Sequence, residues 1–389
     1  MRWEQSRSFE AGLDLGFFNN RLSFIFDYYN RTTDDLLTDV NLPAYTGFSS
    51  MKTNLGRLRN SGFEMEVRAN ILTNPKGLNW EVAANLTSVS NKILKLPTSD
   101  KPFNQIDGYE VAAGLYDPAT GETPTKWIGG YREGGKLGDL VGYVQKHIFR
   151  DWDDVRANAN MVIDEVANLY GPGMADQINP QTGLTYAQSS GWKPIEPGDV
   201  CWDDINQDGK INSLDRAVVG NIFPKVTGGF STTLSYKNLS LYARFDYALG
   251  HTIYNDLKAR SLGQYQGQFN IIDKVHDTWS ETNPDTDLPV FTYADQLNKK
   301  NITRSNNGNT AVDNNSSRFY EKGDYLALRE ITLSYNLPKT WISKAGMTDA
   351  SVYVTGQNLF YITGYDGVSP EPAVATTYGR GIDNGRYPT

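Results

Sequence analysis

The chain lacks several features, and each absence narrows its class. Cys201 is the only cysteine in 389 residues, so no disulfide can form within the chain. No stretch approaches the roughly 18 consecutive apolar residues of a membrane-spanning helix, which excludes a helical membrane protein. Met1 to Glu4 show no charged region followed by an apolar segment, so no signal peptide is expected there. The formal net charge is −8, and no basic stripe is present, which argues against a nucleic-acid partner.

Apolar and polar residues alternate along long segments. The first begins with Phe9, Ala11, Leu13, Leu15 and Phe17, separated by polar residues or glycine. A period of two places these two sets on opposite faces of a strand. We predict eight strands in four hairpins: 8–17 with 22–40, 55–72 with 78–90, 226–236 with 239–249, and 320–337 with 350–362. A short helix is expected between Pro338 and Met347. Most of these strands are longer than the five or six residues typical of globular proteins.

The predicted strands are joined very unequally. Short turns lie at Asn19-Asn20, 73–77 and Lys237-Asn238, whereas the connections over residues 92–225 and 252–319 are long. Short turns at one rim and long loops at the other are typical of outer-membrane β-barrels. Aromatic residues fall near strand ends on the short-turn side, as an interfacial girdle would: Phe17, Phe18, Trp80, Tyr236, Tyr335 and Trp341. We therefore predict an all-β fold: about eight long antiparallel strands of a transmembrane β-barrel with long extracellular loops.

Several ordered motifs run along the chain: Trp3-Glu4-Gln5-Ser6, Glu10 to Leu22, Asp27 to Leu37, Asn60-Ser61-Gly62-Phe63-Glu64, Gly220 to Phe230, and Gly356-Gln357-Asn358-Leu359-Phe360. Together they resemble the TonB-dependent outer-membrane transporters of the SusC/RagA type. The resemblance implies a barrel of about 22 strands with an N-terminal plug and a TonB-binding segment. It also implies import of oligosaccharides or peptides with a SusD-like lipoprotein. Residues 1–389 show no plug domain and lack a last strand, so we expect a C-terminal barrel portion of a longer parent protein.

Residues 204–215 match a twelve-residue calcium loop. Oxygen ligands fall at positions 1, 3, 5, 9 and 12, position 7 supplies a carbonyl, and Gly209 permits the turn at position 6. The predicted ligands are Asp204, Asn206, Asp208, Lys210, Asn212 and Asp215. Asp rather than Glu at position 12, as in dockerin-type loops, predicts a modest affinity for a structural ion. A metal-free turn rich in Asp and Asn is the open alternative.

Flat aromatic side chains in the long connections are candidates for stacking on substrate rings. They are Trp127, Tyr131, Trp152, Trp192, Trp202 and Trp279, and Trp127, Tyr131, Trp192 and Trp279 are the four predicted substrate-binding residues. Packing of the loops on themselves is the alternative for all six. We expect no enzyme activity: Asp151, Asp153 and Asp154 cluster without a positioned general acid, and His147, His251 and His276 are too scattered for a metal pair.

These observations predict part of an outer-membrane importer. Glycans are favoured over peptides as cargo, a SusD-like surface lipoprotein is the expected partner, and the TonB complex would act through a part of the protein outside this chain. The alternative is a soluble or surface-attached β-rich carbohydrate-binding module with a dockerin-like calcium loop. A barrel would partition with the outer membrane, whereas a module would stay in the aqueous fraction.

Overall fold

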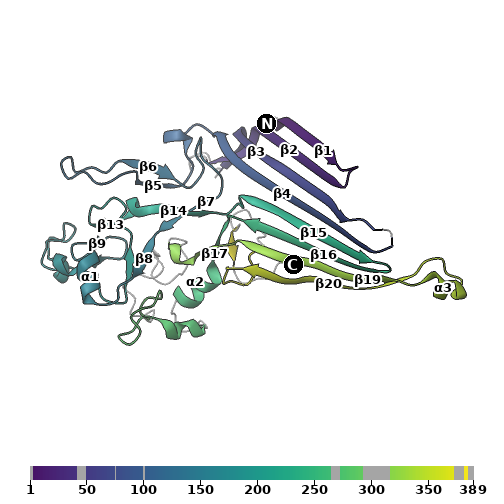
Figure 1. Cartoon of the computed structure of the whole chain (residues 1–389). Coiled ribbons are helices and arrows are strands. Elements are labelled where there is room, and N and C mark those ends of the chain that lie inside the picture. The colour runs from purple at the N-terminus through teal and green to yellow at the C-terminus, as the bar shows by residue number, and fades with distance from the viewer. Residues whose placement is uncertain are drawn as a thin grey trace.

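The protein is built on one antiparallel sheet of eight long strands (Figure 1). The computed structural model describes residues 3–41, 50–74, 76–99, 101–263, 272–291, 316–371 and 381–383. The sheet order is β1-β2-β3-β4-β15-β16-β19-β20. The bounds are β1 Gln5–Phe17, β2 Leu22–Asn41, β3 Ser50–Leu72, β4 Leu78–Lys95, β15 Val226–Tyr236, β16 Leu239–Leu249, β19 Tyr325–Asn336 and β20 Ser351–Thr363. β1 and β20 are the two edges, so this wall is not closed into a barrel.

The strand register separates an apolar face from a polar face across the whole sheet. One row of paired residues is almost entirely apolar: Leu15, Phe24, Val67, Ala84, Phe230, Phe245, Leu328 and Phe360. The next row, on the opposite face, is Gly16, Ser23, Arg68, Ala83, Ser231, Arg244, Glu330 and Gln357. Because residues one position apart point to opposite faces, this register confirms the predicted two-sided strands.

Among the residues that the structure describes, no second layer covers the apolar face. Large side chains on it are exposed, including Phe9, Leu13, Leu333 and Val354. A soluble two-layer protein would bury such a face, so the structure favours the membrane-barrel prediction over a soluble module.

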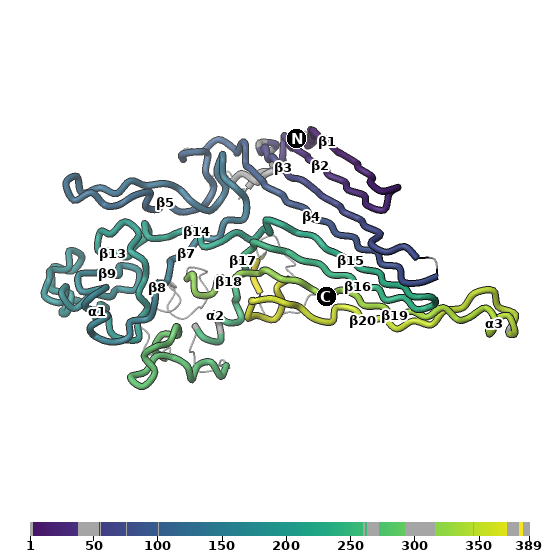
Figure 2. Tube along the Cα trace, viewed as in Figure 1, coloured from purple at the N-terminus to yellow at the C-terminus, as the bar shows by residue number. Residues whose placement is uncertain are grey.

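The two rims of the wall differ as predicted (Figure 2). At one rim β1 turns into β2 through Phe18, Asn19 and Asn20, which all have positive φ, and β15 turns into β16 through Lys237 and Asn238. The expected short helix lies at this rim as α3 (Lys339–Ile342), followed by the 3-10 turn η9 (Ser343–Ala345). The predicted girdle residues Trp80, Tyr236 and Trp341 are exposed.

The predicted strand 320–337 is wrong at its start. Residues 320–322 form a separate strand, β18 (Tyr320–Lys322), and β19 begins only at Tyr325. Residues 323 and 324 separate the two strands, and the Gly323 amide extends the pairing with β17 (Thr252–Asn255) by donating to the His251 carbonyl at 3.0 Å. β18 pairs with β17 outside the main sheet.

The connection between β4 and β15 folds into a loop domain, here defined as residues 101–225. Its strands are β5 Tyr109–Ala112, β6 Thr125–Ile128, β7 Asp139–Tyr143, β8 Gln145–Ile148, β9 Ile163–Asp164, β10 Leu169–Tyr170, β11 Lys193–Pro194, β12 Val200–Trp202, β13 Lys210–Ile211 and β14 Arg216–Asn221. Its helices are α1 Trp152–Ala159 and the 3-10 turns η2 Pro102–Asn104, η3 Pro172–Met174, η4 Tyr186–Gln188 and η5 Ser213–Asp215. Buried residues Phe149, Val155, Leu169, Ile195 and Cys201 form one of its apolar cores. The predicted acidic cluster caps α1, since Asp151 Oδ1 accepts from the amides of Asp153 and Asp154.

The structure describes only part of the second long connection, between β16 and β19. After β17 come α2 (Asp256–Gly263), η6 (Asp273–Asp277) and η8 (Ser317–Phe319). Beyond β20 the chain returns to pair β21 (Ile382–Asp383) with β17. Residues 264–271 and 292–315 of the predicted loop lie outside the described residues. Among the helices that the structure describes, none is long and apolar enough to cross a membrane.

Candidate functional site

The polar face of the wall carries charges of both signs. Glu66, Arg68, Arg244 and Asp246 line one concave patch of this face. Glu10, Asp27, Arg31 and Glu64 line another, near the loop end of β1 to β3. Since the opposite face is apolar, this is the side that meets water in a barrel. A wall of this composition suits the passage of polar cargo.

Arg329 in β19 holds a later segment of the chain against this polar face. It is an extra residue between the pairs Arg244–Glu330 and Phe245–Leu328, which marks a β-bulge. Its side chain is only 15% exposed. The guanidinium lies 3.0 Å from Asp246 Oδ2 and also contacts Glu371. Glu371 follows β20, so the bulge anchors the chain that leaves the last strand.

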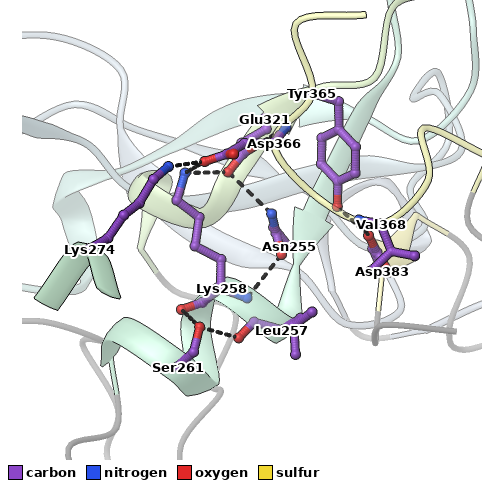
Figure 3. A network of polar contacts seen from close by, with 10 residues as sticks. All are labelled: Asn255, Leu257, Lys258, Ser261, Lys274, Glu321, Tyr365, Asp366, Val368 and Asp383. Carbon is purple, nitrogen blue, oxygen red and sulfur yellow. Dashed lines mark hydrogen bonds and ion pairs between the residues drawn. The ribbon is translucent and has the colours of Figure 1, made fainter. Parts of the chain in front are cut away.

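A second polar network joins the loops at the mouth of the wall (Figure 3). Lys258 Nζ of α2 lies 2.8 Å from Glu321 Oε1 of β18 and 3.1 Å from Asp366 Oδ2, which follows β20. Lys274 of η6 also contacts Asp366. The hydrogen bond from Lys274 is the main reason that the pKa of Asp366 lies below its usual value of 3.8. Burial acts to lower the pKa of Lys258, but the hydrogen bonds and negative charges of Glu321 and Asp366 together outweigh it, and the net shift is upward.

The same figure shows how the chain after β20 is held to β21. Asp383 Oδ2 accepts from the Tyr365 hydroxyl at 2.8 Å and from the Val368 amide at 3.0 Å. Burial raises the pKa of Tyr365, and the bond to Asp383 raises it further, so the phenol stays protonated. Segments from five parts of the sequence therefore meet in one charged junction above the wall: α2, η6, β18, the residues after β20, and β21.

The predicted calcium loop is ordered, and its carboxylates bond to its own backbone. Asp204 accepts from the amides of Asp208 at 3.2 Å and Gly209 at 2.9 Å. Asp215 is 1% exposed and accepts from the amides of Ile205 and Asn212.

The burial of Asp215 changes the pKa of its carboxyl group. Burial raises the pKa of Asp215 to about 7, and the charges of Asp204 and Asp208 add to the rise. Across the described ranges, no three His, Cys, Asp or Glu side chains are grouped so as to hold a metal ion. Calcium binding by the loop therefore stays a prediction.

The four aromatic residues predicted to bind substrate lie in different places. Trp127 is in β6, and Tyr131 follows it on the surface. Trp192 packs edge-on against Tyr186 of η4, with ring centroids 4.9 Å apart. Trp279 lines a cleft in the loops, of about 930 Å³, together with Trp152, another of the loop aromatics noted in the sequence. Lys193 of the same cleft was not among the predicted residues, because the cleft joins segments far apart in the sequence.

The open, two-sided antiparallel wall with loops gathered at one rim defines this chain as part of an outer-membrane-type β-barrel. Residues 1–155 match the family described as TonB dependent receptor-like, beta-barrel. The whole chain is 29% identical to TonB-dependent receptor P3 of Formosa agariphila, covering 33% of that protein, and 27% identical to TonB-dependent receptor SusC of Bacteroides thetaiotaomicron, covering 31%.

Two solved structures have the same fold. The RagAB peptide transporter matches with a TM-score of 0.64 at 23% identity, over 99% of this chain and 34% of that one. The RagAB peptide importer in its 'open-open' state matches with a TM-score of 0.61 at 25% identity, over all of this chain and 34% of that one. Residues 1–155 therefore match the β-barrel of TonB-dependent receptors, and the whole chain is similar to SusC and to the RagAB transporter. It spans about a third of the length of these relatives. The proteins that match it are described as receptors and transporters rather than enzymes.

Proposed function

We propose that the protein to which this barrel part belongs imports an oligosaccharide or a peptide across the outer membrane. The observation that carries the proposal is the continuous mixed-charge face of the wall, with Glu66, Arg68, Arg244 and Asp246 at its centre. The similarity to SusC and to the RagAB importers supports it. A SusD-like surface lipoprotein would deliver the cargo, and the TonB complex would supply energy through a part of the protein outside this chain.

Two measurements test this function. The full-length protein should fractionate with the outer membrane and migrate differently in gels before and after heating, as folded barrels do. Deletion of its gene should abolish uptake of at least one member of a panel of labelled oligosaccharides and peptides, and complementation should restore it. Recovery in the aqueous fraction, or unchanged uptake of the whole panel, contradicts the proposal.

We further propose that residues 204–215 bind one structural Ca²⁺. The ligand spacing and the turn at Gly209, with φ of +79°, support it. The ion would draw Asp204, Asp208 and Asp215 together and fix the loop domain. Titration calorimetry on the intact protein should detect one Ca²⁺ site that Asp208→Ala removes and Asp176→Ala, outside the motif, retains. Equal binding by both variants contradicts the assignment.

A further inference from the structure

A preformed cleft lies between the two long connections, away from the wall. Its volume is about 930 Å³, within the range of small-molecule and peptide sites. One side is formed by the start of α1 and by β11 with the turn that follows, and the other by residues 279–290. The two sides are joined by backbone hydrogen bonds, since the Val290 amide donates to the Gly198 carbonyl at 2.8 Å. The cleft therefore needs no large rearrangement to accept a ligand.

Two tryptophans line the cleft, one held by a hydrogen bond and the other exposed. Trp279 is fixed: its Nε1 donates to the Arg150 carbonyl at 3.0 Å. One side of its ring lies on Gly198, where an added Cβ would approach Trp279 Cε3 to 2.6 Å, so only glycine fits. Trp152, the first residue of α1, is 44% exposed. A fixed and an exposed indole across one cleft supply the electron-rich faces that bind cations.

The charges around the cleft are predominantly negative. Two lining side chains are cationic and four are anionic, a net charge of −2: Arg150 and Lys193 against Asp151, Glu196, Glu281 and Asp285. Arg150 is paired with Asp285, its Nε 3.3 Å from Oδ1. Glu281 is exposed at the rim. A basic side chain would be attracted by these carboxylates and would make cation–π contacts with the indole faces. A neutral sugar would not be attracted by the net charge.

We propose that this cleft binds the Lys or Arg side chain of a peptide cargo, so that the importer takes basic peptides. This inference rests on the proposed function and narrows its substrate to one class. The exposed carboxylates would attract the cationic chain, and Trp152 and Trp279 would enclose its aliphatic stem and charged end. Glycans were favoured from the sequence alone, but the composition of this cleft favours peptides.

The test uses the full-length protein purified in detergent. Dye-labelled Gly-Ala-Lys-Ala-Gly is compared by fluorescence anisotropy with the same peptide carrying norleucine or glutamate, and with maltopentaose as a neutral competitor. The lysine peptide should bind roughly tenfold more tightly than the norleucine peptide. Glu281→Gln and Trp152→Ala should each weaken that binding roughly fivefold or more. Glu122→Gln and Trp341→Ala, which change exposed residues elsewhere, should leave it unchanged.

Three outcomes overturn the inference: equal affinity for the lysine and norleucine peptides, displacement by maltopentaose, or full binding by both cleft variants. Uptake by whole cells separates this inference from the proposed function. If cells import a neutral oligomer but the purified protein shows no preference for lysine, only the cleft assignment fails. If the lysine peptide binds but no member of the panel is imported, the transport proposal fails instead.

Discussion

The guanidinium of Arg329 in β19 binds the carboxylate of Glu371, which lies 42 positions further along the chain. The same guanidinium contacts Asp246 of β16. We predict that Arg329→Met leaves both carboxylates without this partner and destabilises the fold by about 1–3 kcal/mol. Hydrogen exchange should show faster exchange of the amides at 364–371, with little change in β1 to β4. Arg68→Met, which removes an exposed guanidinium from the same face, is the control and should have a much smaller effect.

The apolar face should tolerate charge poorly. Leu333 lies on that face and is 48% exposed, whereas Ser334 points to the polar side. Leu333→Arg puts a charge against lipid two residues from the girdle residue Tyr335 and is expected to cost about 1–2 kcal/mol, between the interface and midplane values. Ser334→Arg should be milder, because its side chain reaches water. Urea unfolding in lipid vesicles measures both. Equal destabilisation would contradict the assigned sidedness.

The charged junction above the wall gives a prediction for pH. The pKa of Asp366 is lowered from 3.8, so its stabilisation is present above that value and is lost as pH falls through the lower folded pKa. The pKa of Lys258 is raised from 10.5, so its stabilisation is present below 10.5 and is lost as pH rises through the higher folded pKa. Protease resistance of the junction segments, residues 256–263 and 364–371, should therefore be nearly constant between about pH 5 and 9 and decline below about pH 4.

Removal of one partner in the junction tests its contribution directly. Lys258→Met leaves Glu321, which is 16% exposed, without its lysine. Local stability around α2 should fall by about 1–2 kcal/mol. Lys237→Met, in the short turn between β15 and β16, serves as the control. If limited proteolysis cuts both variants at the wild-type rate, the junction does not hold the loops.

Cys201 offers a probe of the loop domain. Its side chain is 5% exposed, and burial raises the pKa of its thiol to about 12, so thiolate is scarce at neutral pH. We predict slow alkylation by iodoacetamide in the folded protein and rapid alkylation in urea. If the neighbouring loop 204–215 binds calcium, a chelator should accelerate the reaction, and Asp208→Ala should remove that acceleration. Rapid labelling of the folded protein would contradict the buried environment.

Patterns within short stretches of the sequence predicted the strands of the wall far better than the side-chain contacts of the candidate site. β15 and β16 were predicted to the residue, because alternation ends at a two-residue turn where Lys237 has φ of +53°. The break between β18 and β19 was missed, because β18 pairs with β17, a strand in a different part of the chain. The Lys258–Glu321–Asp366 contacts were missed for the same reason: their partners are 63 and 108 positions apart, and no spacing in the sequence indicates them.

The pairing of β7 with β14 has a consequence for how the chain folds. β4 and β15 are neighbours in the sheet, although the whole loop domain separates them in sequence, so their association carries a high entropic cost of ring closure. β7 and β14 lie inside that interval, and the Ile222 amide donates to the Gly138 carbonyl just beyond their ends. Once these two short strands associate, only residues 222–225 separate β14 from β15, and the interval that remains to be closed next to β4 shortens to residues 96–138. The loop domain would then fold first, and the long strands of the wall would pair afterwards.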